Sequence, residues 1–242
     1  MISLRPRGQH AALRSAAARH GARVLALSPV RIDMRDDADT RQRLRDALAS
    51  PIVVFTSPNA VRGARALQPL RARRGQAWLA VGEGTAAALR RAGIATPVAP
   101  ARMDSTGLLE LPQLQAVEGR RVGLVTAPGG RNRIAPALGA RGAKVLRADV
   151  YQRIAVAPRA DTVARMRALR APWLLLSSGE ALEQLLAALP ADAARHLRRA
   201  RVVAASPRLA ALARRLGFGT VATADSARPR DLLATAVRAA SR

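Results

Sequence analysis

Short apolar segments alternate along the chain with longer segments of helical period. The apolar segments are typical of buried strands, and the intervening stretches, rich in Ala, Leu and Arg, repeat their apolar positions at the spacing of a helix face. We expect strands near residues 2–4, 23–27, 52–56, 78–81, 97–99, 121–126, 145–150, 173–177, 201–204 and 220–222. Strands that alternate with helices predict an α/β protein with parallel sheets.

Several predicted helices have marked ends. Ser57-Pro58 and Ser206-Pro207 each place a capping hydroxyl and a proline directly before a helical segment. Glycines that fit helix C-termini stand at Gly21, Gly93, Gly142 and Gly217.

The pattern repeats with an offset of about 121 residues. Residues 52–57 line up with 173–178, and residues 2–8 line up with 123–129. With a small slip, residues 79–82 line up with 202–205. Two similar α/β lobes commonly leave a cleft between them, where ligands bind. The alternative is two tandem domains without a shared site.

Two polar stretches, residues 31–39 and 153–159, interrupt the pattern and are the natural linkers. They predict a first lobe made of residues 1–33 and 155–242 and a second lobe made of residues 36–152. The first lobe then has its strands in circularly permuted order. We expect the chain to cross twice between the lobes, near 33–36 and 152–156, and to form a two-stranded hinge there. A sequential split near residue 120 is the alternative.

Composition excludes several kinds of site. The chain of 242 residues has no cysteine, which excludes disulfides and thiolate chemistry. The histidines His10, His20 and His196 have no metal-ligand spacing, so we expect no metal site. We expect His10 and His20 to lie on one helix as solvated or cap-side residues. Aromatic residues make up only 2%, which supplies few platforms for stacked bases.

The formal net charge is +25, and of 41 lysines and arginines only Lys144 is a lysine. A field of this sign attracts polyanions. The arginines are distributed over almost every predicted helix, which argues against a specific nucleic-acid interface. No apolar run is long enough to span a membrane, and the start lacks a signal-peptide pattern. We therefore expect a cytoplasmic protein.

Small polar or glycine-rich turns follow the predicted strands and precede helices. The N–H groups at a helix start bind carboxylate or phosphate, and glycine lets the anion approach the backbone. Such turns at the carboxyl ends of parallel strands predict an anion site. Each turn alone also fits an ordinary helix cap. The turns are at residues 5–8, 56–59, 82–85, 126–131, 177–180 and 205–207.

Nucleotide binding is disfavoured, because the turn at Gly82-Glu83-Gly84-Thr85 has Ala87 where a dinucleotide fingerprint has its third glycine. Tyr151 is the single tyrosine and stands at the end of a predicted strand, at the entry to the second linker. It is either an aromatic that packs under the linker or a phenol at the cleft edge that can donate a proton.

These motifs, in this order, resemble the uroporphyrinogen-III synthase family over nearly the whole chain. That family has two α/β lobes, here expected to be flavodoxin-like, of which the first is built from both ends of the chain. The resemblance rests on Arg5-Pro6 with Gln9, Phe55-Thr56-Ser57-Pro58-Asn59-Ala60-Val61, Val81-Gly82-Glu83-Gly84-Thr85-Ala86, Gly129-Gly130-Arg131, Val150-Tyr151-Gln152-Arg153 and Ser177-Ser178-Gly179-Glu180-Ala181-Leu182.

The resemblance implies a cofactor-free lyase. Such an enzyme takes the linear polycarboxylate hydroxymethylbilane, eliminates its hydroxyl as water, and closes the ring through a spiro intermediate with the last pyrrole inverted. By match to the family, Tyr151 is the candidate catalytic acid, and the candidate substrate-binding residues are Arg5, Ser57, Asn59, Gly82, Thr85, Gly130, Arg131, Ser178 and Ser206. The turn that contains Ser206 departs from the family's usual pattern. No apolar face indicates an obligate partner, so we expect a monomer.

Two other functions remain open from the sequence. A two-lobed, non-catalytic module that binds an anionic metabolite would share the cleft and would not need Tyr151. A nucleic-acid-binding protein is motivated by the net charge alone and predicts steeply salt-dependent binding.

Overall fold

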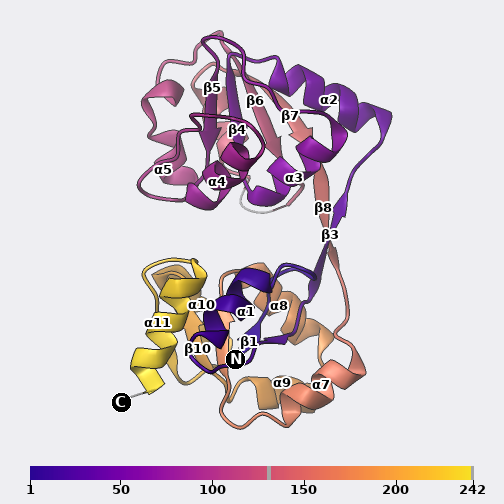
Figure 1. Ribbon diagram of the computed structural model, residues 1–242, viewed down its shortest axis with the longest axis vertical. Helices are drawn as coiled ribbons and strands as arrows, with labels where there is room; N and C mark the ends of the chain where they lie inside the picture. Colours follow the sequence, from indigo (N-terminus) through magenta and orange to yellow (C-terminus); the bar gives the residue numbers. More distant parts are fainter. Residues whose placement is uncertain (130–131, 241–242) are drawn as a thin grey trace. The chain divides into compact units, whose positions relative to one another are not determined.

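The computed structural model describes residues 1–129 and 132–240 and divides into two compact units (Figure 1). Unit 1 comprises Met1–Arg31 and Ile154–Arg242, and unit 2 comprises Ile32–Arg153. Each unit has a parallel sheet with helices on both faces. The predicted α/β class with parallel sheets is therefore confirmed.

The sheet of unit 2 has the strand order β5-β4-β6-β7, and every pair is parallel. A single parallel bridge between Leu79 and Val98 extends the order beyond β5. The strand predicted at residues 97–99 is reduced to this bridge. The strands are β4 (Ile52–Phe55), β5 (Ala77–Ala80), β6 (Arg121–Thr126) and β7 (Lys144–Asp149).

Helices cover both faces of this sheet because its buried strands are apolar on both sides. One face packs against α2 (Ala38–Leu48), α3 (Pro58–Leu67) and α4 (Glu83–Arg91), and Phe55 stacks there on Trp78 with ring centroids 5.6 Å apart. The other face packs against α5 (Ser105–Leu109), the short 3-10 helix η1 (Pro112–Leu114) and α6 (Ile134–Ala140).

The sheet of unit 1 has the order β11-β10-β9-β1-β2, and all pairs are parallel. Under the sequence offset, this is the same spatial order as in unit 2, with β1 and β2 in the places of β6 and β7. Only the order along the chain differs. The strands are β1 (Ile2–Ser3), β2 (Leu25–Ala26), β9 (Trp173–Leu176), β10 (Arg201–Ala204) and β11 (Val221–Thr223).

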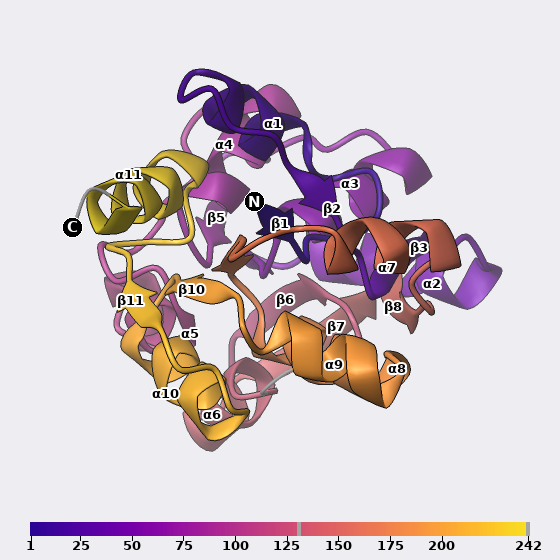
Figure 2. The ribbon, with the colours of Figure 1, turned by 90° about the horizontal axis from the view of Figure 1, so that it is seen from below.

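The helices of unit 1 also form two layers, which Figure 2 shows on opposite sides of the sheet. One face packs against α1 (Ala11–Ala18) and α11 (Pro229–Ala240). The other packs against α7 (Ala160–Arg167), α8 (Gly179–Ala188), α9 (Ala191–Leu197) and α10 (Pro207–Arg215).

Two strands lie where the sequence indicated polar linkers. β3 (Val30–Met34) and β8 (Tyr151–Ala155) pair as a separate two-stranded sheet. Their side chains range from buried to exposed along each strand, which accounts for the mixed polar pattern of the sequence. The chain passes between the units on these two strands.

The predicted helix boundaries are confirmed at their marked residues. Ser57 and Ser206 are the N-cap residues of α3 and α10, each with proline directly after it. The four predicted C-terminal glycines all have a positive φ, the left-handed conformation that ends a helix and that glycine adopts without strain.

Candidate functional site

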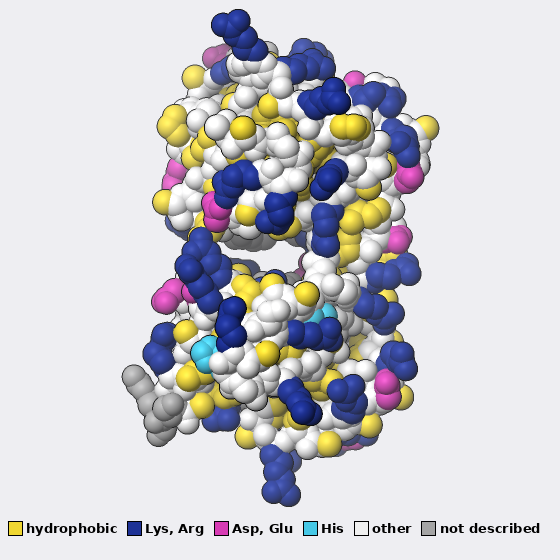
Figure 3. All heavy atoms as spheres, viewed as in Figure 1, with side chains coloured by type: hydrophobic (Ala, Val, Ile, Leu, Met, Phe, Trp, Pro, Cys, Tyr) yellow, Lys and Arg dark blue, Asp and Glu magenta, His cyan; other side chains and the backbone are white. Residues whose placement is uncertain are grey.

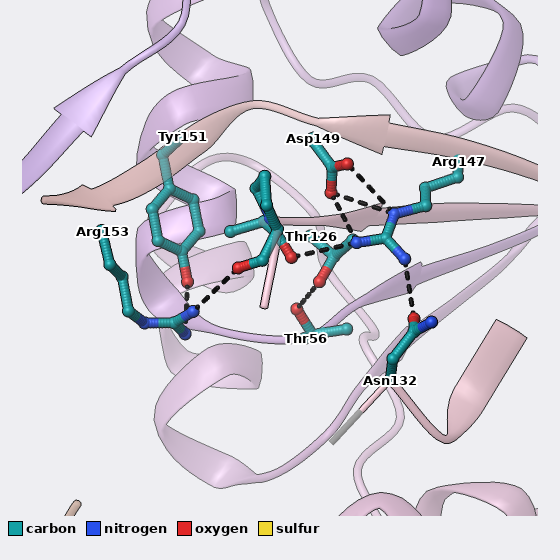
Figure 4. Close-up of polar contacts among 9 residues, drawn as sticks. Thr56, Thr126, Asn132, Arg147, Asp149, Tyr151 and Arg153 are labelled. Atoms are coloured by element: carbon teal, nitrogen blue, oxygen red, sulfur yellow. Dashed lines mark hydrogen bonds and ion pairs between the residues drawn. The ribbon is translucent and has the colours of Figure 1, made fainter. Parts of the chain in front are cut away.

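Tyr151 is the first residue of β8, and its ring packs in the core of unit 2. Its hydroxyl lies among polar side chains (Figure 4). The side chain is 1% exposed. Its Oη lies 3.0 Å from the Ser57 Oγ, and the Arg153 Nη2 donates a hydrogen bond of 3.1 Å to the same Oη. The Arg153 guanidinium carbon is also 5.5 Å from the centre of the tyrosine ring. The phenol is therefore fixed in place by two partners.

Ser57 occupies this position because it caps α3 at the carboxyl end of β4. Its Oγ accepts a hydrogen bond of 3.0 Å from the Ala60 N–H, which satisfies one of the free donors of the helix start. On the preceding residue, the Thr56 Oγ1 donates to the Thr126 Oγ1 over 2.7 Å, which joins the ends of the neighbouring strands β4 and β6.

Arg147 on β7 holds the loop that follows β6 (Figure 4). Its Nε donates to both carboxylate oxygens of Asp149 at 3.1 Å. Its Nη2 donates to the Ala127 carbonyl at 3.1 Å, and its Nη1 donates to the Asn132 Oδ1 at 2.7 Å. One guanidinium thus binds the loop at two residues, Ala127 and Asn132. The predicted substrate-binding residues Gly130 and Arg131 lie between these two, outside the described residues.

The other predicted residues of unit 2 stand at two helix starts. Asn59 is in the first turn of α3, where its Oδ1 accepts from Arg62. Gly82 is the N-cap residue of α4, and no side chain caps that helix there. Thr85 lies in the first turn of α4 and is 2% exposed.

In unit 1, Ser178 and Ser206 stand at the starts of α8 and α10. The Ser178 Oγ accepts from the Ala181 N–H at 3.3 Å, and the Ser206 Oγ accepts from the Leu209 N–H at 3.4 Å. Both are thus helix caps as well as candidate donors to a ligand.

Arg5 follows β1 and is half-buried. Its Nη2 donates to the Ala227 carbonyl at 3.0 Å. Burial lowers the pKa of this guanidinium. No carboxylate within the part of the chain that the structure describes pairs with it. A desolvated cation without a counter-charge is costly, which favours an anionic ligand at this place.

These features suit the holding of carboxylates and the delivery of a proton. The helix starts provide N–H groups and hydroxyls at the carboxyl ends of parallel strands, where α/β proteins bind ligands. Tyr151 provides an ionisable O–H within hydrogen-bonding distance of a second hydroxyl.

The family model described as "Uroporphyrinogen-III synthase HemD" matches residues 11–234. The chain belongs to the uroporphyrinogen-III synthase family. Among curated relatives, the uroporphyrinogen-III synthase of Escherichia coli (strain K12) is 37% identical over 153 residues, and that of Salmonella typhimurium (strain LT2) is 36% identical over 153 residues. In both cases the match spans 62% of this chain and 62% of the relative.

Solved structures of the family share the fold. The uroporphyrinogen III synthase of the extremely thermophilic bacterium Thermus thermophilus, in a mutant form, has a TM-score of 0.65 at 20% identity and covers 99% of this chain and 98% of its own. The enzyme of Helicobacter pylori 26695 has a TM-score of 0.64 at 14% identity, with coverage of 90% and 93%. At these identities the likeness supports the family's α/β fold.

Of the residues that the family pattern indicated, Tyr151 and Ser57 are in direct contact. Asn59 lies in the first turn of the helix that Ser57 caps, whereas Gly82 and Thr85 stand at the separate start of α4. Arg5, Ser178 and Ser206 belong to unit 1.

Some polar residues of this site were missed from the sequence. Arg153 and Arg147 were not identified, because the chain has many arginines. The sequence does not distinguish an arginine that contacts a phenol or a loop from an arginine on a solvated helix. Thr56 and Thr126 belong to two of the predicted turns, but their contact was not predicted, although each ends one of two strands expected to be parallel. The alignment of strand ends could have paired them.

The expectation for His10 was partly wrong. His10 and His20 flank α1 instead of lying on it, and His10 at its N-cap position is 3% exposed. Both ring nitrogens have a partner in this buried position, which offsets the cost of burying them. They lie 3.0 Å from the Ser3 Oγ on β1 and 2.8 Å from the Ser28 Oγ, which follows β2. These contacts are not local in sequence.

Basic side chains are dispersed over the face seen in Figure 3, interspersed with apolar and neutral ones. Within residues 1–129 and 132–240, no helix has the length and apolar character needed to cross a membrane.

Proposed function

We propose that this chain is a uroporphyrinogen-III synthase, which cyclises linear hydroxymethylbilane to uroporphyrinogen III with inversion of the last pyrrole ring and loss of water. The observation that carries the proposal is the family match over residues 11–234. The matched curated relatives, which are covered over 62% of their length, bear this name.

The contacts of Tyr151 support its role as the acid of the reaction. The phenol gives its proton to the hydroxyl of the hydroxymethyl group as the C–O bond breaks, and the hydroxyl leaves as water. A carbon–carbon bond then closes the ring, and the proton lost from the pyrrole carbon that forms this bond returns to the phenolate. The Arg153 guanidinium, which donates to the Oη at 3.1 Å, stabilises the negative charge that the phenol leaves behind. The Ser57 hydroxyl provides a route by which a proton can reach or leave the Oη.

The helix starts support binding of a polycarboxylate substrate. Ser57 and Asn59 on α3, Gly82 and Thr85 on α4, and Arg131 with Gly130 are the proposed contacts in unit 2. Arg5, Ser178 and Ser206 are those in unit 1. We further propose that the paired strands β3 and β8 act as a hinge between the two units.

An isomer assay tests the proposal. Hydroxymethylbilane is generated in situ, the purified protein is added, and the type I and type III porphyrins are separated after oxidation. A dominant type III product is expected, because spontaneous closure gives type I. Type I alone, from protein shown to be folded by circular dichroism, would contradict the synthase activity.

A second candidate function is a non-catalytic module that binds an anionic metabolite. It is favoured by the burial of Tyr151, whose side chain is 1% exposed and therefore needs a rearrangement to meet a substrate. The same assay separates the two functions, because a non-catalytic binding module would leave the type I product of spontaneous closure as the only isomer.

A further inference from the structure

A cavity of about 290 Å³ lies in unit 1 at the carboxyl ends of β1 and β2. Its wall includes three arginines, from the loop after β1, from α1 and from the residue before α7. They are Arg7, Arg14 and Arg159. No carboxylate is among the described residues that line it. Every lining residue belongs to unit 1, so the cavity is complete within that unit.

Two of these arginines have no counter-charge in the described part of the chain. Arg7 and Arg14 are exposed, and neither contacts a carboxylate there. Arg159 differs, because its Nε donates to the Asp161 Oδ1 at 3.2 Å. About two positive charges at the cavity therefore remain uncompensated, which favours an anion of matching charge.

The start of α1 lies at the same cavity, which places the positive end of the helix dipole there. Its N-cap residue, His10, lines the cavity and makes no side-chain capping bond. This contrasts with the capped starts of α3, α8 and α10. Gly8, two residues earlier, is also in the wall and has a φ of +81°. It has no side chain, so the backbone itself forms this part of the wall.

The buried His10 contacts a hydroxyl at the cavity. The His10 Nδ1 lies 3.0 Å from the Ser3 Oγ, which also accepts the Arg5 N–H at 3.4 Å. The His10 Nε2 lies 2.8 Å from the Ser28 Oγ. Ser28 lines the cavity. When the His10 ring is protonated, both of its nitrogens donate, and the Ser28 hydroxyl proton is then available to a ligand.

We propose that this cavity is a binding site for a compact dianion whose charge is carried on oxygen atoms, such as sulfate, phosphate or a pair of carboxylates. Arg7 and Arg14 provide the charge, the start of α1 provides the positive end of its dipole, and Ser28 provides a hydroxyl. The site stands independently of the proposed synthase activity, since it needs only unit 1 and no reaction.

The proposal includes a dependence on pH. Burial, and then the neighbouring charges of Arg14 and Arg5, lower the pKa of His10. Arg7 and Arg159, with Asp161 beside it, are the other charged groups at the cavity. A bound dianion offsets the repulsion and raises this pKa, so binding takes up a proton and strengthens as the pH falls.

Isothermal titration calorimetry with sulfate tests the site, at constant ionic strength set with chloride. Sulfate remains a dianion throughout the range in which histidine titrates. Arg14→Gln is expected to weaken sulfate binding about tenfold, which corresponds to the loss of one charge-assisted contact. Arg19→Gln is the matched control, because Arg19 is the exposed C-cap residue of the same helix and lies outside the cavity. It should bind as the wild type does.

Two further variants test the contacts of His10 with Ser3 and Ser28. Ser28→Ala should weaken binding several-fold while it leaves the cavity open. Sulfate should bind the wild type about three- to tenfold more tightly near pH 5.5 than near pH 8, and His10→Gln should lose this difference. His20→Gln is the control that should retain it. Thermal melts of each variant establish that it is folded.

A parallel titration with succinate distinguishes the sources of the anion. Preference for sulfate indicates an inorganic or phosphoryl group, and comparable binding of succinate indicates paired carboxylates of a larger molecule. Absence of binding by both overturns the proposal. So does equal weakening in Arg14→Gln and Arg19→Gln, since it would show only the general attraction of a chain of net charge +25.

Discussion

The Tyr151 Oη and the Ser57 Oγ lie 3.0 Å apart although 94 residues separate them in sequence. One residue begins β8 and the other caps α3 at the end of β4, so the contact joins the paired strands to the sheet of unit 2. The proposed acid is therefore held by a residue that also organises a helix start.

Tyr151→Phe keeps the buried ring and removes the hydroxyl. Turnover should fall by about 10²-fold, because the departing water loses its proton donor, while affinity for product changes little. The free energy of unfolding should fall by about 1 kcal/mol for the lost hydrogen bonds. Steady-state kinetics and urea unfolding measure the two effects, and unchanged turnover would remove Tyr151 from the mechanism.

A double-mutant cycle of Tyr151→Phe and Ser57→Ala tests whether the two hydroxyls act together. Ser57→Ala alone should cost about 1 kcal/mol through loss of the α3 cap. The double variant should cost less than the sum of the single changes, with a coupling of about 0.5 kcal/mol or more. Tyr151→Phe combined with Ser206→Ala, a cap in the other unit, should be additive within error. A coupling of Tyr151 with Ser57 no larger than in this control would contradict the direct contact.

Arg147→Lys should raise the KM for substrate about tenfold and leave kcat nearly unchanged. Lysine keeps the charge and loses the planar set of donors that reaches Asp149, Ala127 and Asn132 together. Arg121→Lys is the control, since Arg121 stands exposed at the other end of the neighbouring strand β6. A fall in kcat with KM unchanged would mean that Arg147 does not act by positioning the binding loop.

Gly123→Ala should destabilise unit 2 by several kcal/mol, because a Cβ at this position on β6 would lie 2.0 Å from the Ala47 carbonyl oxygen of α2. Gly139→Ala on α6 meets nothing within 4 Å and should stabilise the helix by about 0.5 to 1 kcal/mol. Urea unfolding followed by circular dichroism compares the two. Equal stability of the variants would show that α2 does not pack on β6 at this distance.

Asp37→Asn should reduce the loss of stability at acid pH. Hydrogen bonds from the backbone and side chain of Thr40 lower the pKa of the Asp37 carboxyl, which caps α2. Its charged form is thus favoured by folding, and that stability is present above the ordinary pKa and is lost as the pH falls through the lower folded value, below about pH 4.

Asparagine caps a helix about as well as aspartate and does not titrate, so the variant isolates this effect. Melting temperatures between neutral pH and about pH 3 provide the comparison. Asp225→Asn, a change of charge without a cap, should follow the wild-type pH profile, and a profile of Asp37→Asn identical to the wild type would refute the assignment.

The sequence predicted the elements whose signals are local. The fully apolar segments at Ile52–Phe55 and Trp173–Leu176 are the central strands β4 and β9, and Ser57-Pro58 marks the start of α3 as expected. The pairing of β3 with β8 was not assigned residue by residue, because half-exposed strands have a mixed polar pattern that is also typical of a linker.

The candidate site was predicted less completely, since its polar contacts join distant segments. Tyr151 and Ser57 were singled out separately, because no local signal in the sequence indicates that they touch. The burial of His10 depends on Ser3 and Ser28, which the parallel pairing of β1 with β2 brings to the same end of the sheet. Reasoning from a helix period alone cannot place side chains across a sheet.

The permuted strand order of unit 1 has a consequence for synthesis on the ribosome. β1 pairs with β2 and with β9, so its second neighbour emerges only after the whole of Ile32–Arg153 has been translated. Unit 2 is continuous and has all of its strands available before that point. During translation, β1 and β2 therefore wait for β9 until all of unit 2 has been synthesised. A premature stop codon after residue 153 would leave unit 2 complete, but unit 1 would lack β9, β10 and β11.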